Sequence, residues 1–201
     1  SGQGRTVLFV SHNLAAVKSL CTRGLLLKNG RKIFEGETLD TLEKYMEKDN
    51  QIAEDGKINR EIEKDNKAII THVSITDNKG QINQEVFYDD EIVINLTIES
   101  MIEDKVLLDF TFNTKEGVSV VYAVNSFDKT ELMLKRGTND FQVRLKNNFL
   151  PGKYYLNSGV HDVKGSTIDY LENLTSFTVL NVAKQSEDSY PFNWVNAYTK
   201  T

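Results

Sequence analysis

The chain has 201 residues, of which 39% are hydrophobic and 26% are charged, a composition typical of a globular protein. Its net charge is −5, and lysines and arginines are scattered among the acidic residues, so we expect no nucleic-acid partner. No stretch approaches the ~20 consecutive apolar residues of a membrane helix, and the single cysteine fits a reducing compartment, which we take to be the cytoplasm.

The chain begins with the pattern of an α/β fragment. The run 6–10, TVLFV, is continuously apolar and rich in β-branched residues, which predicts a strand covered on both faces in an α/β sheet. It ends at Ser11-His12-Asn13. Apolar residues then recur with helical spacing over 14–21 and give that segment one apolar face. We therefore predict a buried strand followed by a helix.

A hairpin and a second helix are predicted next. Residues 24–28 and 31–35 flank Asn29-Gly30, a pair that tolerates the positive φ of both central positions in a type I′ turn. Thr38 can cap a helix whose apolar positions extend to Met46, and Asp40 in the first turn favours the helix dipole.

His12 is the first candidate site residue. It directly follows the predicted buried strand, at the edge of an α/β sheet where such folds place their ligands. An imidazole there can donate a hydrogen bond to a phosphate oxygen and orient a water molecule. On position alone, a histidine that serves only as a loop or cap residue remains the alternative.

Residues 47–67 differ from both neighbours in composition. They are dense in charged and amide side chains, and their only apolar residues are isolated, at Ile52, Ala53, Ile58 and Ile62. Such a segment cannot bury enough apolar surface to build a core. We interpret it as a charged linker, with a loose helix as the alternative, and place the domain boundary there.

From residue 68 onward, apolar and polar residues alternate in seven or eight short segments. Turn residues such as Asp77-Asn78-Lys79-Gly80 and Pro151-Gly152 separate the segments. This pattern predicts a mainly β domain over 68–201, an antiparallel β-sandwich of immunoglobulin-like or jelly-roll type. The residues expected to face its core are Ile69, Val73, Ile75, Ile92, Ile94, Leu96, Ile98, Val106, Leu108, Phe110, Phe112, Val118, Val120, Tyr122, Val124, Phe141, Val143, Leu145, Tyr154, Leu156, Val160, Phe177 and Val179.

Four motifs in residues 1–46 occur in the order found in ABC ATPases. They are TVLFVSHN over 6–13, Leu20-Cys21-x-Arg23, Leu27-x-x-Gly30 and Gly36. Together they resemble the switch-histidine region of that family, and the residues around Cys21 and the helix ending at Tyr45 are more narrowly similar to polysaccharide exporters of the Wzt and teichoic-acid type. The resemblance implies that residues 1–46 are the end of an ATPase domain. It also implies that His12, with Ser11 beside it, senses the γ-phosphate of ATP in the intact parent.

The other nucleotide-binding motifs of that family have no counterpart here. The sequence holds no G-x-x-x-x-G-K-[ST] loop for phosphates, no apolar strand ending in paired acids for magnesium, and no serine-glycine-glycine signature. We therefore expect this chain to be a piece of a longer protein that binds no cofactor and has no enzymatic activity. ATP, magnesium and ATPase activity are what the resemblance implies for the intact parent.

The order of the two zones is also that of Wzt-type subunits, in which a C-terminal β-sandwich follows the ATPase domain and binds the exported glycan in some members. Residues 68–181 are similar to that sandwich in length, in strand rhythm and in the segments 151–156 and 159–162. The resemblance implies a carbohydrate-binding module that recognises lipid-linked O-antigen polysaccharide for export. It would act on the cytoplasmic side of the bacterial inner membrane, joined to the transporter's membrane subunit through the parent ATPase. The alternative is a non-catalytic dimerisation or docking domain without direct glycan binding.

The residues between the predicted core positions face outward, so their chemistry can be interpreted. Several carry the amides, carboxylates and aromatic rings that bind neutral sugars, and Lys and Glu are scarce among them. An ordinary polar surface is the alternative, and Arg144 and Lys146 could contact an acidic glycan instead. The predicted carbohydrate-binding group is Asp109, Thr111, Asn113, Asn125, Tyr155, Asn157 and His161.

Two further features lead to expectations. His161-Asp162 resembles a pair of metal ligands, but His72 is distant in sequence and no other ligands cluster with them, so we expect no metal site. The segment 190–195, YPFNWV, is unusually aromatic for a terminus. We expect it to be buried on the sandwich or across a homodimer, by exchange of a terminal strand.

Overall fold

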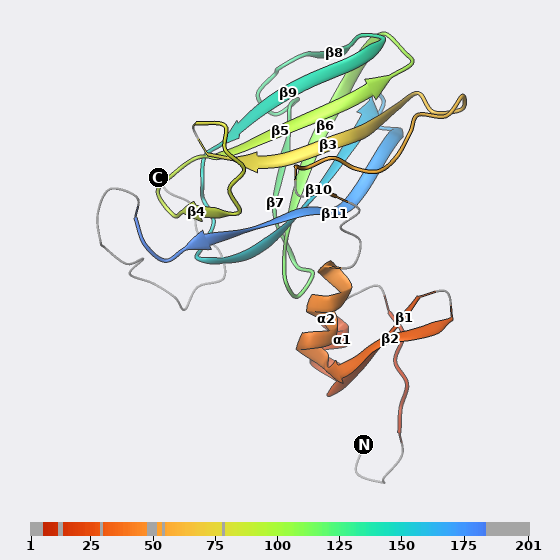
Figure 1. Cartoon of the computed structure of the whole chain (residues 1–201), viewed down its shortest axis with the longest axis vertical. Helices are drawn as coiled ribbons and strands as arrows, with labels where there is room; N and C mark the ends of the chain where they lie inside the picture. Colours follow the sequence, from red (N-terminus) through yellow and green to blue (C-terminus); the bar gives the residue numbers. More distant parts are fainter. Residues whose placement is uncertain are drawn as a thin grey trace. The chain divides into compact units, whose positions relative to one another are not determined.

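The computed structural model of the chain describes residues 6–11, 14–28, 30–47, 52–53, 55–77 and 79–183. The chain divides into two compact units, residues 1–48 with 115–118 and the remaining residues (Figure 1). In the part of the chain that is described, no helix is long and apolar enough to span a bilayer.

The first unit consists of two helices and a hairpin: α1 (Leu14–Leu20), β1 (Arg23–Lys28), β2 (Arg31–Glu37) and α2 (Thr38–Glu47). β1 and β2 pair antiparallel, and Gly30 has a φ of 73° between them, as the predicted turn requires. Gly24 lets β1 approach α2 closely, because a Cβ there would lie 2.6 Å from side-chain atoms of Thr41. The predicted hairpin and both predicted helices are confirmed.

Residues 6–10 do not form the predicted strand. They have no regular structure, and Leu8 and Val10 are 89% and 96% exposed. A parallel strand needs neighbours for its main-chain hydrogen bonds. Among the described residues of this unit only β1 and β2 are strands, and they pair with each other. The prediction of a buried strand is wrong for this reason.

The second unit is the predicted β-sandwich (Figure 1). Its strands are β3 (Ala68–Thr76), β4 (Glu85–Phe87), β5 (Ile92–Ser100), β6 (Asp104–Thr114), β7 (Ser119–Val124), β8 (Leu132–Leu134), β9 (Gly137–Leu145), β10 (Gly152–Asp162) and β11 (Thr167–Leu180). One sheet has the order β3-β5-β9. The six-stranded sheet has the order β4-β11-β10-β6-β7, with β8 paired to β6. The pairing is antiparallel except between β4 and β11, which are parallel.

Apolar residues from both sheets form one buried core. Ile94 and Leu96 of β5 share this cluster with Phe112 of β6 and Phe177 of β11. Phe149, which lies between β9 and β10, contacts both phenylalanines edge to face, with ring centroids 5.0 Å from Phe112 and 5.6 Å from Phe177. Removal of these side chains from water is the main force that holds the two sheets together. The predicted core positions on β3, β5, β6, β10 and β11 are confirmed.

The predicted phase of β7 is only partly right, because Val120 packs on the core as predicted but two other predicted positions do not. Tyr122 and Val118, both predicted to be buried, are 52% and 45% exposed. An irregularity in the pairing places Val121 opposite Phe112, so Val121 packs on the core and Tyr122 projects outward. The run 120–124, VVYAV, is apolar in both phases, so alternation alone could not decide which residues face the core.

Residues 55–67, part of the segment predicted as a linker, contain no helix and lie against the sandwich. Ile58 is 3% exposed and belongs to the core cluster. Arg60 donates two hydrogen bonds to Asp169 of β11, at 2.8 and 3.0 Å. Asp169 also accepts a hydrogen bond from the main-chain N–H of Ile70 in β3, at 2.8 Å. The ion pair between Arg60 and Asp169 therefore holds residues 55–67 on the sandwich, and through Asp169 it is connected to both sheets.

Candidate functional site

The outer face of the six-stranded sheet carries most of the predicted sugar-binding residues. In the strand register, Asp109 lies beside Gly159, and Thr111 lies between Tyr122 and Asn157. Side chains two residues apart on a strand project from the same face, so these rows form one surface. We call it the Asp109 patch, and its members are Asp109, Thr111, Tyr122, Asn157, His161 and Tyr170.

Asp109 is the centre of the hydrogen bonds in this patch. It is 6% exposed, and its Oδ2 accepts a hydrogen bond from the hydroxyl of Tyr122 at 3.1 Å. The same oxygen lies 3.0 Å from Nε2 of His161. Oδ1 is buried and has no hydrogen-bond partner among the described residues. Because buried polar atoms are normally paired, this oxygen is an acceptor that a ligand or a water molecule can satisfy.

Gly159 makes room for this arrangement. A Cβ at residue 159 would lie 2.5 Å from Nε2 of His161 and 2.9 Å from Oδ1 of Asp109. Any larger residue would therefore displace the histidine, the carboxylate or both. On the other side of the imidazole ring, the hydroxyl of Thr167 lies 3.2 Å from Nδ1 and helps to fix the ring.

Two partly exposed tyrosine rings belong to the patch. Tyr122 and Tyr170 are 52% and 43% exposed, and Phe127, 70% exposed, packs edge to face on Tyr122 with ring centroids 6.0 Å apart. Burial of the phenol, followed by the charge of Asp109, raises the pKa of Tyr122. Burial, followed by the charge of Glu172, raises the pKa of Tyr170. Both phenols are therefore neutral near pH 7 and keep their hydrogens.

Asn157 supports the patch from within the sheet. It is 4% exposed, and its Oδ1 accepts a hydrogen bond from the main-chain N–H of Asn173 at 2.8 Å. Asn173 has a φ of 52°, a left-handed conformation that asparagine tolerates better than most residues. The Nδ2 of Asn157 lies 3.5 Å from the hydroxyl of Tyr170. Asn157 therefore stabilises the irregular part of β11 at Asn173 and helps to position Tyr170.

Three predicted residues are placed apart from this patch or cannot present their side chains. Asn125 accepts a hydrogen bond from the main-chain N–H of Leu108 at 2.9 Å and donates one to the carbonyl of Thr130 at 2.7 Å, so its amide is engaged by the main chain. Asn113 lies further along β6, beside Tyr155 in the register. Tyr155 is fully buried, so its ring cannot stack on a sugar.

Sequence reasoning did not identify Tyr122 and Tyr170 as site residues. Tyr122 was assigned to the core because the apolar run around it fits either phase. Tyr170 lies beside Gly159 only because β11 pairs with β10, and its hydroxyl meets an amide from that neighbouring strand. No local pattern in the sequence gives this pairing.

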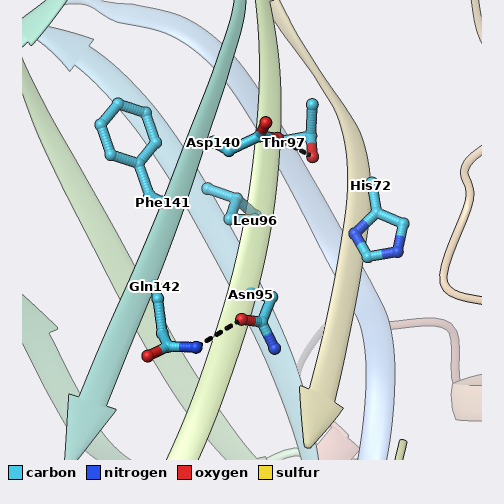
Figure 2. A pocket seen from close by; sticks show the side chains of 7 residues that line it. All are labelled: His72, Asn95, Leu96, Thr97, Asp140, Phe141 and Gln142. Carbon is cyan, nitrogen blue, oxygen red and sulfur yellow. Dashed lines mark hydrogen bonds between the residues drawn. The ribbon is translucent and has the colours of Figure 1, made fainter. Parts of the chain in front are cut away.

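A pocket of about 370 Å³ lies on the outer face of the three-stranded sheet (Figure 2). It is lined by His72, Asn95, Leu96, Thr97, Asp140, Phe141 and Gln142. Four of its polar side chains are joined in two pairs, since Gln142 donates to Asn95 at 3.0 Å and Thr97 donates to Asp140 at 2.7 Å (Figure 2). None of these seven described residues has a buried, unpaired polar atom like Oδ1 of Asp109. The Asp109 patch is therefore the stronger candidate.

Some predicted features lie outside the described residues. These include His12, the predicted nucleotide sensor, and the aromatic segment 190–195. Ser11 is described and is partly buried without regular structure. Within the described ranges, no group of three or more His, Cys, Asp or Glu side chains is placed to hold a metal ion.

Comparison with known proteins gives one family. The family model of the Wzt C-terminal domain matches residues 59–193 and does not include residues 1–48. The crystal structure of the C-terminal domain of Wzt is similar in fold, with a TM-score of 0.54 and 15% sequence identity, over 73% of this chain and 92% of that chain. No curated protein matches the chain in sequence.

Two further structural similarities have lower TM-scores. A β-D-mannosidase from Dictyoglomus thermophilum has a TM-score of 0.41 and 22% identity, over 58% of this chain and 14% of that chain. A Niemann-Pick type C2 protein from the Japanese carpenter ant has a TM-score of 0.41 and 10% identity, over 56% of this chain and 92% of that chain.

Proposed function

The chain belongs to the Wzt C-terminal domain family, and from this membership we propose that it binds the polysaccharide that its exporter carries. Membership makes it a domain of an ABC exporter subunit. The observation that supports glycan binding is the Asp109 patch, where a buried acceptor and two partly exposed tyrosine rings share one sheet face. Neutral sugars have hydroxyl groups for such an acceptor and apolar ring faces for such rings.

In this proposal the ligand lies across β11, β10, β6 and β7. A sugar ring packs on Tyr170 or Tyr122, and one of its hydroxyl groups donates to Oδ1 of Asp109. Thr111 and His161 contact neighbouring hydroxyl groups, and Phe127 extends the aromatic surface for the next sugar unit. The domain holds the glycan and performs no chemistry on it.

We further propose that the first unit is the end of the ATPase domain, with His12 and Ser11 at the γ-phosphate of ATP in the intact parent. Its exposed apolar side chains support this proposal, because a folded unit of this size seldom leaves so many uncovered. Examples are Leu20, Leu25 and Leu27, which are 69%, 53% and 55% exposed. In the parent, magnesium and the phosphate-binding groups come from outside this sequence. We place the assembly at the cytoplasmic face of the inner membrane, bound to the membrane subunit.

The glycan proposal can be tested by NMR titration of the ¹⁵N-labelled chain with delipidated O-polysaccharide from the bacterium that makes the protein. We expect saturable shift changes at the Asp109 patch. Tyr170→Ala and Phe127→Ala should each weaken binding roughly two- to tenfold, the range of an aromatic contact worth about 0.5–1.5 kcal/mol. Tyr45→Ala is the matched control, because Tyr45 is 37% exposed and lies on α2 in the first unit.

Three other results would change the conclusion. Saturable shifts confined to the pocket of the three-stranded sheet would move the glycan site to that face. Binding that persists unchanged in both aromatic variants would reject the Asp109 patch. No saturable shift at all, in a chain that sedimentation shows to be a homodimer, would favour the dimerisation or docking domain.

A further inference from the structure

The unpaired oxygen of Asp109 restricts which ligand atoms can complete the patch. A carboxylate accepts hydrogen bonds and donates none. Oδ2 is already within hydrogen-bond distance of Tyr122 and His161, whereas Oδ1 has no hydrogen-bond partner among the described residues. A hydroxyl, an amide N–H or an ammonium group can meet that oxygen. A second carboxylate or a phosphate would bring oxygen against oxygen with no hydrogen between them.

A proton on the histidine would not make the patch positively charged. His161 contacts the carboxylate of Asp109 directly through Nε2, at 3.0 Å. If the imidazole takes a proton, the pair becomes neutral and does not become positive. Glu172 adds a second negative charge, close enough to help raise the pKa of Tyr170. The patch is therefore neutral or negative at any pH at which its carboxylates are ionised.

The outward-facing lysines on β6 and β10 lie toward the ends of the surface. Lys105 is four residues from Asp109, and Lys153 is six residues from Gly159. At ~3.3 Å per residue these separations are about 13 and 20 Å along the strands, beyond the ~8 Å screening length at physiological salt. Lys105 is also paired with Glu131 at 2.9 Å. Neither lysine is placed to neutralise an acidic sugar held at Asp109.

The arginines that could serve an acidic ligand lie elsewhere on the sandwich. Arg60 is bound to Asp169, which is adjacent to Tyr170 in β11 and so projects from the opposite face of that strand. Arg144 lies on β9 in the other sheet, with its guanidinium 3.6 Å from Glu91. Neither Arg60 nor Arg144 is therefore placed to neutralise an acidic sugar at the Asp109 patch.

We propose that the sugar unit bound at the Asp109 patch is uncharged or carries an amine, that it donates a hydrogen bond to Oδ1 of Asp109, and that acidic sugars are excluded. The inference rests on the proposed glycan function and adds the chemical class of the ligand to it. An ammonium group gains further from the tyrosine faces, because a cation is attracted to an aromatic ring.

The test uses the full chain and four β-1,4-linked tetrasaccharides that differ in one substituent. The probes are cellotetraose, N-acetylchitotetraose, its deacetylated amine form, and cellotetraose oxidised to the carboxylate at C6. Calorimetry or NMR titration should show binding of the first three. We expect the carboxylate form to bind at least roughly tenfold more weakly than cellotetraose, because like charges brought together oppose association.

Two variants connect this selectivity to one carboxylate. Asp109→Asn, which is nearly isosteric, should weaken binding of the neutral and amine probes roughly ten- to hundredfold, the range for a hydrogen bond to a charged group, and should reduce discrimination against the acidic probe. Tyr122→Phe keeps the ring and the charge of Asp109, so exclusion of the acidic probe should persist. Asp140→Asn is the matched control, since Asp140 lies in the pocket of the other sheet.

Each outcome distinguishes this inference from the proposed function. Tight binding of the acidic probe, or unchanged selectivity in Asp109→Asn, would overturn the inference while binding of the O-polysaccharide kept the proposed function intact. Failure of all four probes in a chain that binds the O-polysaccharide would also overturn it, because three of them supply the donors that we invoke. Failure of the O-polysaccharide itself would overturn the proposed function.

Discussion

The ion pair between Arg60 and Asp169 offers the sharpest test of how the sandwich is held together. The two side chains are 25% and 9% exposed, and they are joined by two hydrogen bonds. Asp169→Ala leaves the guanidinium without a counterion in a mostly buried place, a change that costs about 3–5 kcal/mol for fully buried pairs. Because the side chain of Arg60 is partly exposed, we expect the unpaired charge to cost less here, about 2–3 kcal/mol. The main-chain N–H of Ile70 also loses its acceptor, which adds about 1 kcal/mol.

We therefore expect Asp169→Ala to lower the free energy of unfolding by about 3–4 kcal/mol. Urea denaturation followed by circular dichroism measures it, and an unchanged m-value would show that the unfolded state is not affected. Glu131→Ala is the control. It breaks the pair with Lys105, whose side chains are 49% and 75% exposed, and an exposed pair contributes almost nothing to stability.

A loss below about 1 kcal/mol would refute this reasoning, because the segment 55–67 would then not be fastened by this pair. The double variant Arg60→Met, Asp169→Leu separates charge from packing. Replacement of a buried pair by apolar side chains is often neutral, so it should recover most of the stability that Asp169→Ala loses. If the double variant is as unstable as the single one, the shape of the site matters more than the uncompensated charge.

Three further predictions concern Tyr154, Gly159 and Asn125. Burial raises the pKa of Tyr154 to about 12, so this phenol ionises at lower pH in the unfolded chain than in the folded one. The stability that it contributes is fully present below pH 10 and should fall by about 3 kcal/mol between pH 10 and 12. Tyr154→Phe should show a flatter profile of stability against pH. Gly159→Ala should destabilise the fold by about 1–3 kcal/mol in urea titrations and abolish glycan binding, because the new methyl group displaces His161 and Asp109; retained binding would contradict the crowding argument. Asn125→Ala should lower thermal stability by about 1–3 kcal/mol, because the main-chain N–H of Leu108 loses its acceptor, and an unchanged melting temperature would mean that water replaces the amide.

The sequence predicted the sandwich well where only one phase of alternation was apolar. On β5, Ile92, Ile94, Leu96 and Ile98 were assigned to the core, and all four are buried. On β7 both phases are apolar, and an irregularity in the pairing with β6 decides the orientation of Tyr122. Such an irregularity depends on two strands at once, so the pattern of one strand could not predict it.

The candidate site was predictable in chemistry but not in position. The sequence marked Asp109, Asn157 and His161 as outward polar residues suited to sugars. Their meeting depends on β10 pairing with β6, which brings Asp109 and His161 within hydrogen-bond distance although 52 residues separate them in the chain. The burial of Tyr155 is likewise a property of the folded sheet and not of its alternating pattern.

Stability alone does not account for the Asp109 patch. A buried carboxylate oxygen without a partner costs about 1–3 kcal/mol, and a glycine within a strand weakens the sheet by roughly 0.5–1 kcal/mol relative to alanine. Both costs occur at one place, because Gly159 leaves the space that Asp109 and His161 fill. The pocket on the other sheet carries amides and a carboxylate of the same kinds, but these side chains are hydrogen-bonded in pairs, Gln142 with Asn95 and Thr97 with Asp140. Two unfavourable features that coincide on one face, with partly exposed tyrosines on the neighbouring strands, are explained more simply by a bound ligand than by the requirements of the fold.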